Sequence, residues 1–70
     1  MTFDVMEREY IHKNGWYINS AGMLELTAAQ AAKEPYLGRS VWEPNRRTLM
    51  IPSIHGCSLL FEGQHFIIKD

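Results

Sequence analysis

The side chains best suited to binding chemistry gather between residues 36 and 47, where aromatic and arginine residues alternate. The members of this set are Tyr36, Arg39, Trp42, Arg46 and Arg47. Tyrosine, tryptophan and arginine are enriched at the energetically important positions of protein interfaces. Arginine also binds phosphate, and aromatic rings stack on bases. The segment therefore predicts a protein-binding surface, and the alternative is a nucleic-acid or phosphate-ligand binding module.

A purely structural role for the same side chains is the competing interpretation, in which Trp42 folds back under the loop and the arginines are solvated. Arg46 and Arg47 are adjacent, so in an extended backbone they point to opposite sides and only one shares a surface with Trp42. Trp16 and Tyr17 are adjacent on an earlier expected strand, where one ring must face outward. An exposed ring there adds Trp16 to the binding candidates, or marks a homodimer surface.

Histidine and cysteine side chains raise the question of a metal site or a nucleophile. His55 and Cys57 can lie on one side of a strand, but zinc needs four convergent ligands, and His65 is expected on the face opposite Cys57. A nucleophilic cysteine needs a base within hydrogen-bond reach, and the apolar neighbours of Cys57 favour an inert thiol. We therefore expect no catalytic residue, no metal ligand and no cofactor, in a protein that is not an enzyme.

The length of 70 residues and the net charge of −1 limit the class of protein. We expect one domain over residues 1–70, which buries only about 60% of its unfolded surface. The single Cys57 excludes an intramolecular disulfide, so a homodimer or a stable protein partner is the expected source of further stability. A lone cysteine and a start without a signal peptide predict a cytoplasmic protein, and short apolar runs predict no membrane segment. The near-neutral charge argues against a strongly basic nucleic-acid binder.

Residues 57–70 are expected to form a β-hairpin that turns at Glu62 and Gly63. With a two-residue turn, Leu59 pairs with Phe66. The core face of this hairpin then carries Cys57, Leu59, Phe61, Phe66 and Ile68. The opposite face carries Ser58, Leu60, Glu62, His65 and Ile67. Truncation of Leu59 or Phe66 is therefore expected to cost more stability than truncation of Leu60.

A second turn signal lies near the start of the chain. Residues 3–13 have both helical and strand spacing, but Asn14 and Gly15 both tolerate positive φ and form the strongest short-range hairpin signal. We therefore expect residues 10–13 to pair with residues 16–19. A third short strand is expected over residues 23–26.

One helix is expected to begin after Thr27, because Gln30 lies three residues further on in the spacing of a capping box. Pro35 ends it. Residues 36–47 are expected to form a loop, and residues 48–51 a strand followed by a turn over residues 52–56. The predicted fold is α+β: a small antiparallel sheet of 4–5 strands, made of two hairpins, with one short helix packed on one face.

These expectations point to a small non-enzymatic binding protein that acts as an inhibitor or adaptor through a protein–protein interface. Bacterial and phage accessory proteins that block a larger machine are often of this type, which is an analogy of size and composition. A nucleic-acid partner is the second expectation, through the arginines of residues 36–47. A small ligand bound between two protomers is a third interpretation.

Overall fold

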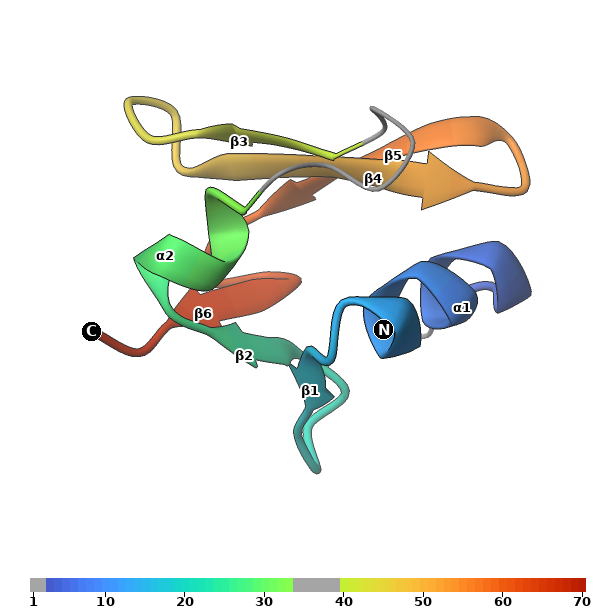
Figure 1. Cartoon of the computed structure of the whole chain (residues 1–70), viewed down its shortest axis with the longest axis horizontal. Helices are drawn as coiled ribbons and strands as arrows, with labels where there is room; N and C mark the ends of the chain where they lie inside the picture. The colour runs from blue at the N-terminus through green and yellow to red at the C-terminus, as the bar shows by residue number, and fades with distance from the viewer. Residues whose placement is uncertain (1–2, 34–39) are drawn as a thin grey trace.

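The computed structural model describes residues 3–33 and 40–70 (Figure 1). These residues form two helices and six strands. In chain order the elements are α1 (Val5–Lys13), β1 (Tyr17–Ile18), β2 (Leu24–Leu26), α2 (Ala28–Ala31), β3 (Val41–Glu43), β4 (Thr48–Ser53), β5 (Gly56–Phe61) and β6 (Phe66–Ile68). Neither of these two helices is long and apolar enough to cross a membrane.

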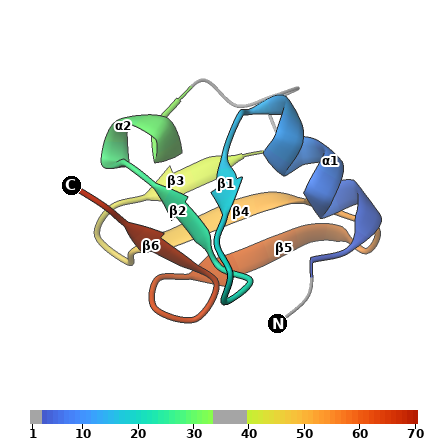
Figure 2. The ribbon, with the colours of Figure 1, turned by 90° about the horizontal axis from the view of Figure 1, so that it is seen from below.

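The six strands form two three-stranded sheets. In one sheet, β4 lies between β3 and β5 and is antiparallel to both. In the other, β2 lies between β1, which is antiparallel to it, and β6, which is parallel to it. The β3–β4–β5 sheet forms one layer, and the helices and the other sheet lie on one side of it (Figures 1 and 2). The α+β class is confirmed, but the expected single sheet with one helix is corrected to two sheets and two helices over the described residues.

The start of α1 is held by reciprocal hydrogen bonds. The Asp4 carboxylate accepts from the Glu7 N–H and the Glu7 carboxylate accepts from the Asp4 N–H, both at 2.7 Å, which is a capping box. The other Asp4 oxygen accepts from the Ile54 N–H at 3.1 Å, in the turn between β4 and β5. Burial raises the pKa of the Asp4 carboxyl, but hydrogen bonds from the N–H groups of Glu7, Ile54 and Met6 outweigh it and lower the pKa.

The end of α1 uses the residues that were expected to turn a hairpin. Asn14 is the C-cap, and Gly15 follows it with φ of 71°. The Trp16 N–H donates to the Ile11 carbonyl at 3.1 Å, and the Gly15 N–H donates to the carbonyl two residues before the cap at 3.0 Å. This is a Schellman motif, in which glycine takes the left-handed conformation after a helix. The hairpin prediction at Asn14 and Gly15 is therefore wrong, because the same dipeptide also ends helices.

The predicted start of α2 is confirmed. The Thr27 hydroxyl accepts from the Gln30 N–H at 3.1 Å, and the Gln30 side chain accepts from the Thr27 N–H at 2.8 Å. The Ala28 N–H donates to the carboxylate of Asp70 at 2.9 Å, which ties the helix to the last residue of the chain. Pro35, the predicted end of this helix, lies outside the described residues.

The register of β5 differs from the expected one because its hydrogen-bonded neighbour is β4. A two-residue turn at Ile54 and His55 joins the two strands, and Leu49 lies opposite Leu60. Leu60 therefore points inward and is 3% exposed, whereas Leu59 is 45% exposed. Cys57, Leu59 and Phe61 face outward, so the predicted core face of this strand is wrong.

β6 leaves the sheet of β5 and pairs with β2, with Phe66 opposite Leu24 and Ile68 opposite Leu26. The predicted pairing of residues 57–61 with residues 66–68 is therefore wrong. Gly63, with φ of 89°, lies in the turn that reverses the chain between the two strands. The prediction that Phe66 faces the core is correct, because its side chain is fully buried.

Part of the expected 36–47 loop is a strand. β3 (Val41–Glu43) pairs with β4, and residues 44–47 form the turn between them. Residues 36–39 lie outside the described part of the chain. The predicted strand at residues 48–51 is confirmed as the larger part of β4.

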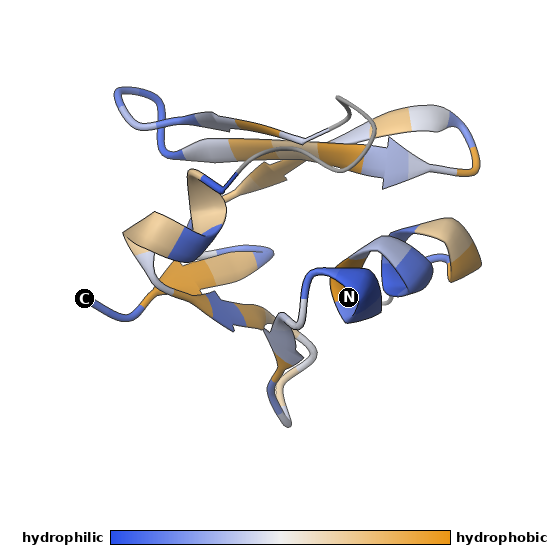
Figure 3. Cartoon of the chain, in the orientation of Figure 1, coloured by the Kyte–Doolittle hydropathy of each residue, from blue (hydrophilic) through white to orange (hydrophobic). Residues whose placement is uncertain are grey.

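The buried apolar side chains form one cluster between the two layers. They are Phe3, Tyr10, Ile11, Trp16, Leu24, Leu26, Ala31, Leu49, Ile51, Leu60 and Phe66. Figure 3 shows the hydrophobic residues along the strands and a hydrophilic turn between β3 and β4. α1 packs against β4 from the core side, so the other face of the β3–β4–β5 sheet is left without a covering element among the described residues.

Truncation of the two adjacent leucines of β5 should have very different effects. Leu60→Ala removes a buried side chain and should lower the free energy of unfolding by about 2–5 kcal/mol. Leu59→Ala changes a half-exposed side chain and should cost less than about 1 kcal/mol. Urea unfolding followed by circular dichroism measures both. Equal losses would contradict the observed register.

Replacement of Asp4 should make stability less dependent on pH. The pKa of Asp4 in the folded protein lies below its ordinary value of 3.8, so its stabilising contribution is present above that pH and is lost as the pH falls through the folded pKa. Asp4→Asn keeps one acceptor oxygen but cannot accept both backbone hydrogen bonds. Its melting temperature should lie below that of the wild type at neutral pH, and the difference should shrink at acidic pH.

Glu9→Gln is the matched control, because Glu9 is an exposed carboxylate on the same helix. Its melting temperature should follow the wild type at every pH. A constant gap between Asp4→Asn and the wild type from neutral pH down to about pH 2 would contradict the assigned role of Asp4.

Candidate functional site

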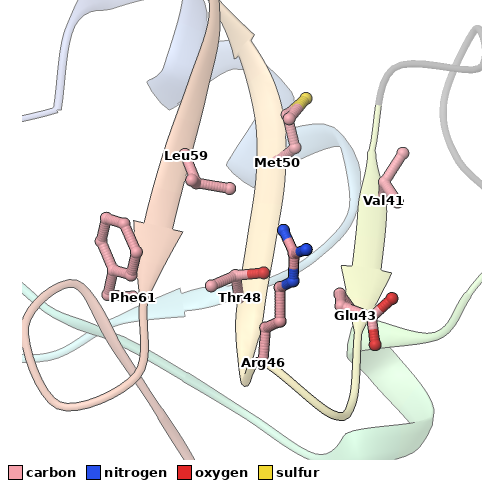
Figure 4. Close-up of a pocket in the computed structure, with 7 residues that line it drawn as sticks. All are labelled: Val41, Glu43, Arg46, Thr48, Met50, Leu59 and Phe61. Carbon is pink, nitrogen blue, oxygen red and sulfur yellow. The ribbon is translucent and has the colours of Figure 1, made fainter.

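The outer face of the β3–β4–β5 sheet exposes a group of apolar side chains (Figure 4). Because side chains alternate along a strand and the strands are in register, Val41, Met50 and Leu59 form one row across the three strands. Thr48 and Phe61 lie in the next row, with Glu43 at its β3 end. We call the four apolar side chains of these rows, which are Val41, Met50, Leu59 and Phe61, the outer apolar face.

Exposed large apolar side chains are concentrated on the outer apolar face. Its four side chains are exposed by 56%, 36%, 45% and 42%, respectively. Among the described residues nine large apolar side chains are exposed, and the other five are divided between α1, the β4–β5 turn, β1 and β6. Contiguous exposed apolar patches typically mark interaction surfaces.

The face is hollowed and has charged groups at one end. A depression of about 400 Å³ is lined by the outer apolar face together with Glu43, Arg46 and Thr48. Figure 4 shows Arg46 extending from the β3–β4 turn onto this face, near Glu43 on β3. Arg46 has no ion pair with any described residue. The depression has an apolar floor, with a guanidinium and a carboxylate at its rim.

Trp42 lies on the inner face of the same sheet, in the row of Leu49 and Leu60. Its ring packs edge to face against Phe66, with centroids 6.0 Å apart and an interplanar angle of 76°. The guanidinium of Arg47 lies 5.2 Å from the centroid of the Trp42 ring, in cation–π distance. Trp42 is therefore half-buried between the core and a charged side chain.

Arg47 is held in place by Glu62. Its Nε donates to Glu62 Oε1 at 2.8 Å and its Nη2 donates to Oε2 at 3.1 Å, a bidentate pair that reaches from the β3–β4 turn to the end of β5. This hydrogen bonding raises the pKa of Arg47 and lowers the pKa of Glu62. Arg47 also has a positive φ of 54°, which is uncommon outside glycine. Glu62 occupies two of the five N–H donors of this guanidinium and balances its charge, which makes Arg47 a weaker phosphate ligand than an unpaired arginine.

The predicted binding residues are thus divided among different places. Arg46 lies on the outer face, Arg47 and Trp42 lie on the inner side, and the expected separation of the two arginines is observed. Trp16 is only 6% exposed and packs edge to face on Tyr10 at 5.6 Å, so its ring does not form a surface patch. Tyr36 and Arg39 lie outside the described residues.

Sequence reasoning missed the outer apolar face itself. A signal for it was present in residues 59–61, which are three consecutive apolar residues. In a strand, at least one of three consecutive side chains faces the side opposite the other two. The predicted pairing of residues 57–61 with residues 66–68 places Leu59 and Phe61 in the core, and that pairing is not the one observed.

Of the candidate metal-binding or nucleophilic side chains, His65 contacts the backbone and Cys57 lies at the surface. The Nδ1 atom of His65 accepts from the Phe61 N–H at 2.9 Å. Cys57 is an exposed free thiol on the outer face of β5. Over residues 3–33 and 40–70, no three histidine, cysteine or acidic side chains are grouped so that they could hold a metal ion.

Comparison of the chain with protein-family models, with curated proteins and with solved structures found no match.

Removal of the Arg47 side chain should expose the Trp42 ring. We expect Arg47→Ala to increase acrylamide quenching of tryptophan fluorescence, because the guanidinium no longer covers the ring and Trp16 is too buried to contribute much. Arg46→Ala, the matched control, should leave quenching unchanged. Equal effects of the two substitutions would contradict the assignment of these side chains to opposite faces.

Proposed function

We propose that this protein is a small non-enzymatic binding module that acts as an inhibitor or adaptor by docking its outer apolar face on a protein partner. The observation that supports the proposal is the grouping of four large exposed apolar side chains in two adjacent rows of one sheet face. Burial of such side chains contributes about 25 cal/mol per Å² of apolar area removed from water. The hollowed centre of the face would receive an apolar side chain of the partner.

The charged rim suggests the chemistry of that partner. Arg46 and Glu43 stand at the same end of the depression, so a fitting surface would carry an acidic group opposite Arg46 and a basic group opposite Glu43. Rim charges of this kind orient a partner and raise the association rate more than the affinity. The partner class is therefore a protein surface with apolar residues bordered by both signs of charge.

The residues that could carry other chemistry are used to hold the fold, which also supports a binding role. Asp4 and Glu7 cap a helix, Glu62 is paired with Arg47, and His65 accepts a backbone N–H. The alternative of a nucleic-acid or phosphate ligand would depend on Arg46 and Arg39, since Arg47 is engaged. We favour the protein partner because the exposed surface around Arg46 is mainly apolar.

A double substitution on β3 and β4 tests the proposal. Val41→Thr with Met50→Thr keeps side chains that suit strands but removes apolar surface from the outer face. The immobilised wild-type chain should recover a protein from the source lysate, and the immobilised double variant should not. Once that partner is identified, it should bind the double variant at least tenfold more weakly than the wild type.

Tyr17→Thr is the matched control, because Tyr17 is 60% exposed on β1, which belongs to the other sheet. It should recover the partner as the wild type does. Equal recovery by the double variant would overturn the outer apolar face as the site. We expect no binding of single-stranded DNA or RNA when either is titrated into the wild type at low salt. Low salt is the condition in which phosphate contacts would bind most strongly.

A further inference from the structure

β5 is an edge strand, and its ladder with β4 determines the direction in which its backbone N–H and C=O groups point. The Glu62 N–H donates to the Arg47 carbonyl at 3.2 Å, so at this pair the backbone groups face the β4 side. Hydrogen-bonded pairs alternate along an antiparallel ladder, so the even-numbered residues of β5 face β4 and the odd-numbered ones direct N–H and C=O outward. Pro52, which has no N–H, lies opposite Cys57, as a non-hydrogen-bonded pair allows.

Cys57, Leu59 and Phe61 direct their backbone groups outward, and those of Phe61 already have hydrogen-bond partners. The Phe61 N–H donates to His65 Nδ1 at 2.9 Å. The Phe61 carbonyl accepts from the N–H groups of Gln64 and His65 at 3.1 and 2.9 Å. The outward N–H and C=O groups of Cys57 and Leu59 have no partner in the described part of the chain. The free edge of β5 therefore offers four backbone groups.

This edge lacks the features that usually prevent strand pairing between molecules. Residues 56–61 contain no charged residue and no proline, and the ladder with β4 runs without a bulge from Ser53 and Gly56 to Thr48 and Phe61. Edge strands of monomeric proteins are normally protected by charges, prolines or bulges. Cys57 and Leu59 are also exposed, so a second strand can approach.

We propose that β5 pairs antiparallel with β5 of a second copy of this chain, about a two-fold axis at Ser58. Each Cys57 then lies opposite Leu59 of the other copy, and the two pairs exchange four hydrogen bonds. An axis at Leu59 would place Cys57 opposite Phe61, whose backbone groups are engaged by His65 and Gln64. An axis at Cys57 would place Leu59 opposite His55 in the turn. Only the axis at Ser58 uses all four free groups.

The side chains and charges of β5 suit a second copy. With the axis at Ser58, Glu62 of one copy lies opposite Ile54 of the other, so no like charges meet along the new ladder. Leu59 lies beside Cys57 of the other copy on the outer side. The product is a six-stranded sheet in which the two outer apolar faces become continuous. Edge pairing alone buries little area, so the dimer should be weak and concentration-dependent.

Sedimentation velocity over about 1 µM to about 1 mM tests the pairing. The wild type should shift from monomer to dimer mass as concentration rises. Leu59→Pro removes an outward N–H at an edge position, where proline is tolerated, and should remain monomeric with an unchanged circular dichroism spectrum. Leu59→Ala keeps the N–H and should still dimerise. A monomeric wild type, or a Leu59→Pro variant that dimerises equally, would overturn the proposal.

Crosslinking gives a test that does not depend on proline. In the Leu59→Cys variant the new thiol lies opposite the native Cys57 of the other copy, so mild oxidation should yield an interchain link between positions 57 and 59, identified by peptide mapping. In the wild type the two Cys57 residues are diagonal neighbours about 7–8 Å apart and should link slowly. Absence of the 57–59 link, or a dominant link between the two Cys57 residues, would overturn the register.

The result is separable from the proposed function. The outer-face test changes Val41 and Met50 on β3 and β4, which leaves the backbone edge of β5 intact. Sedimentation of the wild type tests self-pairing without any substitution in the outer apolar face, so a monomeric wild type would overturn the pairing and leave the proposed docking face in place.

Discussion

The Phe61 carbonyl accepts hydrogen bonds from the backbone N–H groups of Gln64 and His65, and the Phe61 N–H donates to the His65 imidazole. This turn ends β5 and directs the chain out of the β3–β4–β5 sheet. Gly63 supplies the positive φ that the reversal requires. β6 can then enter the second sheet beside β2, which brings Phe66 into the centre of the core and against Trp42. Because β6 pairs with β2, β5 remains at the edge of its sheet.

Polar side chains hold the ends of the chain to segments distant in sequence. Asp4 joins the start of α1 to the turn at Ile54, a separation of 50 residues, and Asp70 joins the end of the chain to Ala28, a separation of 42. A short chain buries a small core, so each additional long-range contact restricts fraying that the core alone would not prevent. Arg47 and Glu62 do the same between the β3–β4 turn and the end of β5. Exposed ion pairs of this kind contribute modestly to stability, but they determine where the loops lie.

Local patterns predicted local structure well and failed where two structures share one pattern. The capping box of Thr27 and Gln30 predicted α2, and the same spacing at Asp4 and Glu7 marks α1, but the dipeptide at residues 14–15 favours both a hairpin and a helix end. The faces of residues 57–61 depended on which strand lies beside them. That choice is made by the hairpin with residues 48–53, whose two-residue turn places Leu60 opposite Leu49, and by the pairing of β6 with β2, which the turn signal at Glu62 and Gly63 does not reveal.

The candidate site was predictable only in part for the same reason. The arginines and Trp42 were identifiable by type, yet their distribution over two faces follows from the strand at residues 41–43, which the sequence pattern presented as a loop. The outer apolar face became visible only once β5 was placed beside β4. By residue type alone its residues resemble core residues, and only their positions in the sheet show that they are exposed.

The core does not require the outer apolar face to be apolar. Side chains alternate, so the residues that fill the core are Leu49, Ile51 and Leu60, and their neighbours point away from it. Strand propensity favours valine and phenylalanine at exposed positions, but it gives no preference for methionine or leucine over threonine. Polar residues would serve a solitary monomer better at Met50 and Leu59, because exposed apolar surface promotes association. The apolar identity of this row is therefore not a requirement of the fold, and it is the feature on which the proposed docking depends.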